Sequence, residues 1–296
     1  MKIFYSILIS IAFTGSFYEP DFIQKKNKNI KIVYTEESPL IDGIMDKSIW
    51  TDIEPISDFL QEDPISMSSP SQLTEVRILY DKENIYVLAE MHVDDPKNIS
   101  SRVVNRDNWE EGFDGVSDYF SIDIDSRHDH QTGFIFSVNS AGVQADAVIF
   151  DDNGYDADWN GVWQSEVTIL NNSWIVEIKI PFSCLRFSNS DDMVWGLNMY
   201  RYIHYTNEYI AWVAYPLGIP GISSKYGHLI GIDKILTNKR IEIVPYLISG
   251  RNIFYDVNLT HPNSNPLQHE EFLYFQNDTN IGLDLKYGLG TNSTLD

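Results

Sequence analysis

The sequence is short of basic residues and of cysteine, and these two shortages exclude several classes of protein. Its 296 residues include 21 Lys and Arg against 43 Asp and Glu, which gives a formal net charge of −22. A nucleic-acid-binding surface needs clustered Lys and Arg to contact phosphates, so nucleic acid is not an expected partner. The single cysteine, Cys184, excludes an internal disulfide.

Recognisable catalytic motifs are also missing, so no catalytic residue is assigned. The sequence contains no H-E-x-x-H, no G-x-S-x-G and no P-loop. Cys184 lies in the apolar stretch IPFSCLRF and is expected to be buried and inert. Glycoside hydrolysis needs only two suitably placed carboxylates, so a hydrolase of O-glycosyl bonds, or a part of one, remains an alternative function.

One apolar run, Ile3 to Phe13, stands near the start of the chain. It is too short to span a bilayer as a helix. Lys2 precedes it and Thr14-Gly15-Ser16 follows it, which is typical of a signal peptide. We therefore predict a signal peptide over residues 1–16, a linker over 17–29, and export to a bacterial cell envelope, in the periplasm or outer membrane. The lack of cysteine in an exported protein agrees with this location.

From Ile30 onward the pattern is almost entirely that of β-strands. Short runs rich in Val, Ile, Tyr and Phe alternate with Asn, Asp, Gly and Pro turns. Hairpins are expected at 74–91, at 118–139 and at 163–180, followed by strands at 194–204 and 209–215. The one short helix expected lies at 46–52. Many short strands with little helix predict an all-β fold, a β-sandwich.

The pattern changes near residue 237. Residues 280–289 (NIGLDLKYGL) alternate strictly between apolar residues and charged or very small ones. About ten residues with one apolar face are typical of a transmembrane β-barrel strand, although an ordinary amphipathic strand fits as well. We predict that residues 237–296 are the first strands of an outer-membrane β-barrel, and that this chain is the front of a longer protein.

Several segments resemble, in order, those of family 9 carbohydrate-binding modules. They are IDGIMDKSIW at 41–50, then LYDKENIYVLAEM, DYFSIDID, FSVNSAG, SWIVEIKIPFSCLRF, VWGLNMYR and SKYGHL. The resemblance covers residues 30–236 and implies a jelly-roll-like antiparallel β-sandwich, calcium in some members and binding of sugar chain ends. The remainder resembles the start of an uncharacterised bacterial outer-membrane family, in which such a module precedes a barrel.

The resemblance also implies particular ligand contacts. Two tryptophans hold a sugar in characterised modules, and the first corresponds to Trp109, within the step Trp109-Glu110. The place of the second holds Pro220-Gly221, which is a departure from the family pattern. A sugar-binding arginine falls at Ser137, and a carboxylate of the central strand falls near Tyr119.

Two aromatic residues and one acidic loop are the candidate sites that the residues themselves indicate. Trp109, beside Glu110, and Trp159 stand in polar segments, where an exposed indole offers a flat face for sugar C–H groups. The second segment also carries the oxygen ligands that calcium prefers. The candidate metal ligands are Asp151, Asp152, Asp156, Asp158 and Asn160.

Carbohydrate binding by an exported module is the function that these observations favour. The module would hold a polysaccharide or oligosaccharide and would reach the outer membrane through a barrel that this chain only begins. A third alternative, besides the hydrolase, is a structural plug or gate of that barrel with no sugar ligand. The departure at Pro220-Gly221 favours the plug, and the lack of catalytic motifs disfavours the hydrolase.

Overall fold

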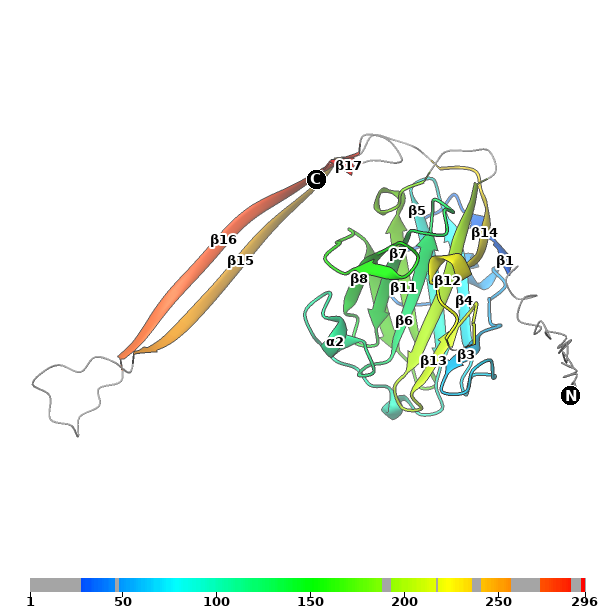
Figure 1. Cartoon of the computed structure of the whole chain (residues 1–296), viewed down its shortest axis with the longest axis horizontal. Helices are drawn as coiled ribbons and strands as arrows, with labels where there is room; N and C mark the ends of the chain where they lie inside the picture. Colours follow the sequence, from blue (N-terminus) through cyan, green and yellow to red (C-terminus); the bar gives the residue numbers. More distant parts are fainter. Residues whose placement is uncertain are drawn as a thin grey trace, which may run out of the picture.

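Two sheets packed face to face form the body of the protein (Figure 1). A computed structural model describes residues 28–45, 48–187, 193–216, 218–235, 241–256, 272–288 and 294–295. The predicted signal peptide and most of the predicted linker lie outside these residues. The fold is all-β, as the alternating runs predict, with short helices α1 (Ser48–Thr51) and α2 (Trp109–Gly112) and 3₁₀ helices η2 (Pro96–Asn98), η3 (Phe182–Cys184) and η4 (Ser223–Lys225).

The larger sheet has nine strands among the described residues, with β6 near its middle. Its main path runs β1 (Asn29–Lys31), β14 (Gly227–Ile232), β12 (Met193–Ile203), β6 (Tyr119–Asp125), β7 (Gly133–Asn139), β8 (Gln144–Phe150) and β9 (Gly154–Asp156). β13 (Glu208–Ala211) pairs with β12, and β3 (Leu60–Asp63) pairs with β13. The predicted pairing of β6 with β7 is confirmed, and their register is antiparallel.

The smaller sheet has five strands in the order β10 (Gln164–Ile169), β11 (Ser173–Pro181), β5 (Asn84–His92), β4 (Thr74–Tyr80) and β2 (Val33–Tyr34). The two hairpins predicted here, β4–β5 and β10–β11, are both formed. Alternate residues of each strand point to opposite faces, so every second side chain enters the space between the sheets. Phe120, Ile122 and Ile124 of β6 meet Val87, Ala89 and Met91 of β5 in this core.

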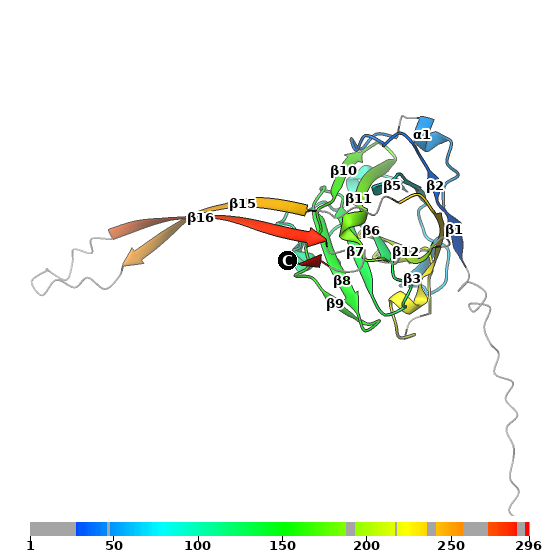
Figure 2. The same cartoon turned by 90° about the horizontal axis from the view of Figure 1, so that it is seen from above.

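A second, smaller apolar cluster covers the outer face of the smaller sheet. Figure 2 shows α1 on that side, away from β8 and β9. Trp50 of α1 is fully buried against Leu79, Tyr86, Leu88 and Ile175. Its indole Nε1–H donates to Glu177 Oε1 at 2.9 Å, while the amides of Asp42 and Gly43 donate to Glu177 Oε2 at 2.8 and 2.7 Å. The I-D-G and Trp elements of the opening motif therefore fasten this segment to β11.

The strand predicted at 209–215 is shorter than expected, because β13 ends at Ala211. Asn198 of β12 supplies the reason. Its side-chain Oδ1 accepts from the Val213 amide at 2.8 Å, and its Nδ2 donates to the Val213 carbonyl at 3.0 Å. The Asn198 side chain thus makes the hydrogen bonds to the Val213 backbone that a neighbouring strand would make if β13 continued.

The remaining strands form a separate sheet of β15 (Ile241–Asp256), β16 (Phe272–Gly288) and β17 (Thr294–Leu295). β15 and β16 are antiparallel over their whole paired length and extend away from the sandwich in Figure 1. Both strands are longer than the sequence patterns predict. Within the described part of the chain, no helix is long and apolar enough to cross a membrane.

Candidate functional site

A pocket of about 320 Å³ lies on the outer face of the larger sheet. This volume falls at the lower end of the range usual for small-ligand sites. Three strands supply its floor, because β12, β6 and β7 are neighbours in the larger sheet and their side chains that point away from the core lie side by side. Facing strands place Asp123 opposite both Ile135 and Asn198, and place Ser121 opposite both Ser137 and Tyr200. These six residues all line the pocket.

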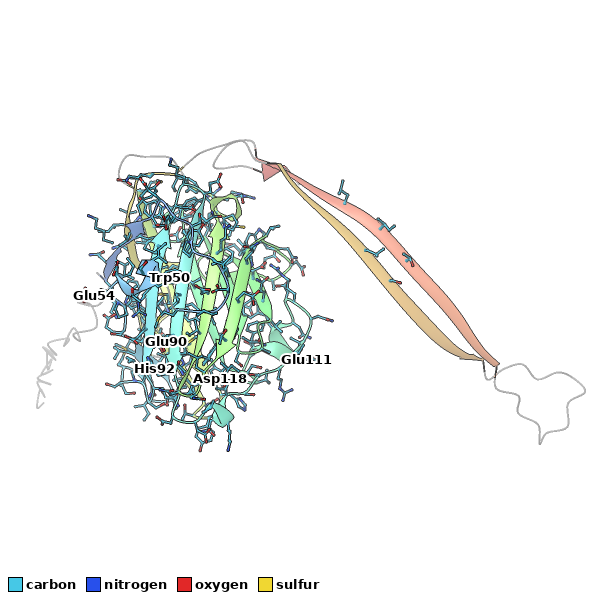
Figure 3. All side chains as sticks on the ribbon, turned by 180° about the vertical axis from the view of Figure 1, so that it is seen from behind. Trp50, Glu54, Glu90, His92, Glu111 and Asp118 are labelled. Atoms are coloured by element: carbon cyan, nitrogen blue, oxygen red, sulfur yellow. The ribbon has the colours of Figure 1, made fainter. Side chains whose placement is uncertain are left out.

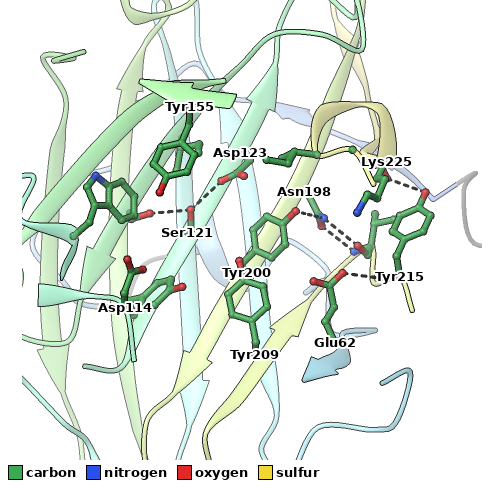
Figure 4. A pocket seen from close by; sticks show the side chains of 17 residues that line it. Glu62, Asp114, Ser121, Asp123, Tyr155, Asn198, Tyr200, Tyr209, Tyr215 and Lys225 are labelled. Atoms are coloured by element: carbon green, nitrogen blue, oxygen red, sulfur yellow. Dashed lines mark hydrogen bonds between the residues drawn. The ribbon is translucent and has the colours of Figure 1, made fainter. Parts of the chain in front are cut away.

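Tyrosines supply most of the aromatic surface of the pocket. Tyr119, Tyr200 and Tyr209 line it from the sheet, and Tyr155 and Tyr215 line it from β9 and from the segment after β13 (Figure 4). The rings of Tyr200 and Tyr209 are stacked, with centroids 5.5 Å apart and planes 25° apart. Burial, with the nearby Asp123 carboxylate, raises the pKa of both phenols well above the usual value. These hydroxyl groups therefore stay protonated.

Asp123 is the most deeply buried acid in the pocket, at 4% exposed. Its Oδ2 accepts from the Tyr226 hydroxyl at 2.8 Å and its Oδ1 accepts from the Ser121 hydroxyl at 2.9 Å. Ser137 donates in turn to Ser121 at 2.9 Å, which completes a short chain of hydroxyl groups. Burial raises the pKa of Asp123 to about 7, against the smaller lowering by the two hydroxyl donors. A side chain that changes charge near neutral pH thus lies in the pocket.

Two further carboxylates and one lysine surround the tyrosines. Glu62 of β3 accepts from the Tyr215 amide at 3.0 Å, and burial raises its pKa. Asp114, which follows α2, also has a pKa raised by burial. The Lys225 ammonium donates to the Ile219 carbonyl at 2.7 Å and lies 5.4 Å from the centroid of the Tyr215 ring.

Of the predicted aromatic contacts, Trp109 lines this pocket. It begins α2, a four-residue helix whose first turn is capped by Asn108, with Oδ1 accepting from the Glu111 amide at 3.2 Å. The ring of Trp109 packs at 5.2 Å on Phe113, and the Phe113 ring lies 5.7 Å from Tyr119. The indole is half-buried rather than free in a loop, and its Nε1–H has no partner among the described residues.

Glu110 and Trp159 lie outside the pocket. The Glu110 side chain is exposed on α2 and is not part of the lining. The Trp159 ring is half-buried and packs on Phe134 and Phe136, with centroids 5.3 and 5.9 Å away. Sugar binding by Glu110 and by Trp159 stays a prediction. The contacts of the Trp159 ring show that it packs against the sheet.

The five predicted metal ligands are spread along the segment from β8 to β10. Asp152 already accepts from the amides of Ile222 and Ser224 and from the hydroxyls of Ser223 and Ser224, at 2.7 to 3.1 Å. Burial alone would raise its pKa, but these donors outweigh burial and lower it. The loop thus uses Asp152 to hold the η4 segment beside the pocket.

No three of these aspartates bring their oxygens together in the described part of the chain. A group whose ligand atoms do lie within 4.8 Å of one another is Glu75, Glu90 and His92, on the smaller sheet (Figure 3). The carboxylates of the acidic loop are thus not gathered into one group, and calcium binding there stays a prediction. A rise in melting temperature specific to calcium over magnesium would show that the loop rearranges around the ion.

Sequence reasoning missed most of the pocket floor. The segment DYFSIDID was assigned to a strand, yet its Tyr119, Ser121 and Asp123 form one continuous polar face. The strand predicted from Val194 to His204 likewise carries two polar residues of the pocket face, Asn198 and Tyr200. Alternation with polar residues on the outward face could have identified both strands as a binding surface. Glu62 gave no such signal, because it reaches the pocket from a distant short strand.

The geometry defines a class of protein, a β-sandwich binding module with an aromatic and polar pocket on one sheet. Residues 41–216, more than half of the chain, match the profile of the "carbohydrate family 9 binding domain-like" family. The chain belongs to this family, and carbohydrate binding by a β-sandwich module is its function. No curated protein matches the sequence.

Solved structures with the same fold include a candidate carbohydrate-binding protein from Bacteroides uniformis ATCC 8492. It is 14% identical with a TM-score of 0.54, and the match covers 69% of this chain and 98% of that one. A family 9 module from Caldicellulosiruptor kristjanssonii in complex with glucose is 18% identical with a TM-score of 0.46, over 69% and 95% of the two chains. A family 9 module from the same organism in complex with cellotriose is 18% identical with a TM-score of 0.44, and the match covers 69% of this chain and 93% of that one.

Proposed function

We propose that the pocket on β6, β7 and β12 is the carbohydrate site, and that it holds one unit of an oligosaccharide. The observation that carries this proposal is the combination of a tyrosine-rich wall with hydroxyl, amide and carboxyl groups on the same sheet face. Sugar rings present apolar C–H faces and polar edges, and stacked aromatic rings beside hydrogen-bonding groups match both.

The positions that the family resemblance marks give a second line of support. Ser137, at the place of a sugar-binding arginine, and Tyr119, near the place of a central-strand carboxylate, both line the pocket. Trp109 and Gly221 line it too. Gly221 has φ +96°, and a Cβ there would lie 2.7 Å from Asp152 Oδ2 and 2.5 Å from Ser224 Oγ. A side chain therefore does not fit at this position, and Tyr215 and Tyr155 supply aromatic surface in its place.

Replacing Trp109 with alanine is expected to weaken oligosaccharide binding by about 5- to 150-fold, because loss of a partly desolvated ring contact costs about 1–3 kcal/mol. Calorimetric titration of the whole protein with glucose and cellotriose measures the change. Tyr205→Ala is the matched control, since Tyr205 is 65% exposed and lies outside the pocket. Equal affinities of wild type and Trp109→Ala would show that sugar binds elsewhere.

We also propose that the sandwich is exported after removal of residues 1–16, and that residues 237–296 begin an outer-membrane β-barrel. Support comes from the alternating pattern of β16 and from its long pairing with β15. Leu247, Ile281 and Leu283 are 67%, 81% and 61% exposed, so most of the surface of these apolar residues is uncovered in the described chain. Lipid is an environment that accepts such a surface.

Ending the chain at Asn238 is expected to increase its solubility and to leave the melting temperature of the sandwich unchanged. The reason is that β15, β16 and β17 pair only with one another among the described strands. Thermal unfolding of the full and shortened chains, with sedimentation after expression, measures both effects. A fall of several degrees in the melting temperature would show that the tail stabilises the sandwich.

A further inference from the structure

The pocket holds an excess of negative charge. Three carboxylates line it, those of Glu62, Asp114 and Asp123, against a single Lys225 among the described lining residues. Figure 4 shows the three acids on different sides of Tyr200. The Lys225 ammonium donates to the Ile219 carbonyl and faces the Tyr215 ring, and its attraction lowers the pKa of Glu62, so this one cation offsets only part of the charge of three carboxylates.

None of the three acids has a cationic partner within hydrogen-bonding distance in the described part of the chain. Within the described residues, the Asp123 carboxylate accepts only from the hydroxyl groups of Ser121 and Tyr226, and the Glu62 carboxylate accepts only from the Tyr215 amide. The Asp114 carboxylate has no hydrogen-bond or ion-pair partner among these residues, and burial is the cause of its raised pKa. A carboxylate that is partly desolvated without a countercharge raises the free energy of the unliganded pocket, and a ligand cation would lower it.

The aromatic side chains add to this preference. Tyrosine faces carry negative electrostatic potential and attract cations within about 6 Å of the ring centroid. Five tyrosines and Trp109 line the same cavity as the three acids. Such surroundings favour an ammonium group on a ring-shaped ligand over a carboxylate, which the acids would repel.

We propose that the preferred ligand of this pocket is an amino sugar with a free, protonated amine, as a unit of a cationic oligosaccharide. This inference rests on the proposed carbohydrate function of the pocket. The sugar ring lies on the tyrosine surface, and the ammonium group donates to one or more of Glu62, Asp114 and Asp123. A bare metal ion is not the expected occupant, because the oxygens of these three acids are not gathered into one group that could hold an ion.

The test is a calorimetric titration of the whole protein at about pH 6.5, where an ordinary amine is largely protonated. Glucosamine, N-acetylglucosamine, glucose and glucuronate are four probes of similar size that differ in charge. Glucosamine is expected to bind about tenfold more tightly than glucose or N-acetylglucosamine, and glucuronate to bind most weakly. Added salt should reduce the advantage of glucosamine, because it screens charges near the surface.

Two conservative variants assign the effect to the pocket acids. Asp114→Asn removes a charge that has no partner in the described chain, and Glu62→Gln keeps an acceptor for the Tyr215 amide. Each is expected to reduce the preference for glucosamine over glucose by about two- to fivefold, measured as the ratio of the two affinities so that a loss common to both sugars cancels. Glu166→Gln, on the exposed part of β10, is the matched control and should leave the preference unchanged.

Protonation gives a second readout in the same titration. A bound ammonium group favours the ionised form of Asp123, so glucosamine binding should release protons and glucose binding should not. Comparing two buffers of different ionisation enthalpy measures the release, and Asp123→Asn should abolish it. Burial and the hydroxyl donors Tyr226 and Ser121 set the pKa of this carboxyl. The other titratable groups that line the same pocket are Glu62, Asp114, Lys225, Tyr119, Tyr155, Tyr200, Tyr209 and Tyr215.

The outcomes separate this inference from the carbohydrate function. Equal binding of glucosamine, N-acetylglucosamine and glucose, or tightest binding of glucuronate, would overturn the preference for an amino sugar and leave the pocket as a sugar site. Failure of all four sugars and of cellotriose to bind would overturn both proposals.

Discussion

Arg201→Met is expected to lower the free energy of unfolding by about 3–5 kcal/mol, because it leaves several buried acceptors unpaired at about 1–3 kcal/mol each. Arg201 belongs to β12 but is fully buried and reaches the other sheet. Its Nη1 donates to the Leu73 carbonyl at 2.9 Å and to Thr74 Oγ1 at 3.1 Å, and its Nη2 donates to the His92 carbonyl at 2.7 Å. Methionine fills similar space and satisfies none of these acceptors.

Urea unfolding of the wild type and the variant measures this loss. Arg102→Met is the matched control, because the Arg102 side chain is exposed and its substitution should cost less than about 0.5 kcal/mol. A loss below about 1 kcal/mol for Arg201→Met would show that water replaces the guanidinium at little cost.

Asp123→Asn is expected to remove a fall in stability that the wild type shows as pH rises from about 4 to about 7. Burial raises the pKa of Asp123 to about 7 in the folded protein, whereas an ordinary Asp titrates near pH 4. Between these values the folded protein keeps a proton that the unfolded chain has released, so raising the pH favours unfolding. Above pH 7 the carboxyl is ionised in both states and its effect no longer changes.

The expected size of this effect is about 2–4 kcal/mol between pH 4.5 and pH 8, taken as the difference between wild type and variant. Taking the difference matters because Glu62, Asp118 and Asp125 also have pKa values raised by burial, and their contributions are common to both proteins. Urea unfolding at a series of pH values measures it, with Asp158→Asn on an exposed loop as the control. Parallel curves for wild type and Asp123→Asn would mean that water reaches this carboxyl.

Local sequence patterns were enough to predict the sandwich. The hairpins β4–β5, β6–β7 and β10–β11 follow from short runs rich in Val, Ile, Tyr and Phe that are bounded by turn residues, and this pattern depends only on neighbouring residues. Trp50, which ends the opening segment IDGIMDKSIW of the family resemblance, is fully buried. Trp109 was selected for its polar neighbours, and it does line the pocket.

Contacts between distant segments could not be predicted. Glu177 receives the Trp50 indole across 127 positions of sequence, and Arg201 meets Leu73 across 128. Asp152 looked like a metal ligand because its sequence neighbours are acidic, whereas its donors come from the η4 segment 70 to 72 residues later. Which acids lie in one pocket is decided by strand order and register, and no single segment contains that information.

The most direct test of the central claim is the location of a bound sugar by NMR chemical shifts on the isotope-labelled protein. Titration with glucosamine or cellotriose should shift the backbone amides of Ser121, Asp123, Ser137 and Tyr200. It should leave those of β10 and β11, on the other sheet, unchanged. Shifts confined to the smaller sheet, for example around Glu75, Glu90 and His92, would contradict the assignment of the pocket as the carbohydrate site.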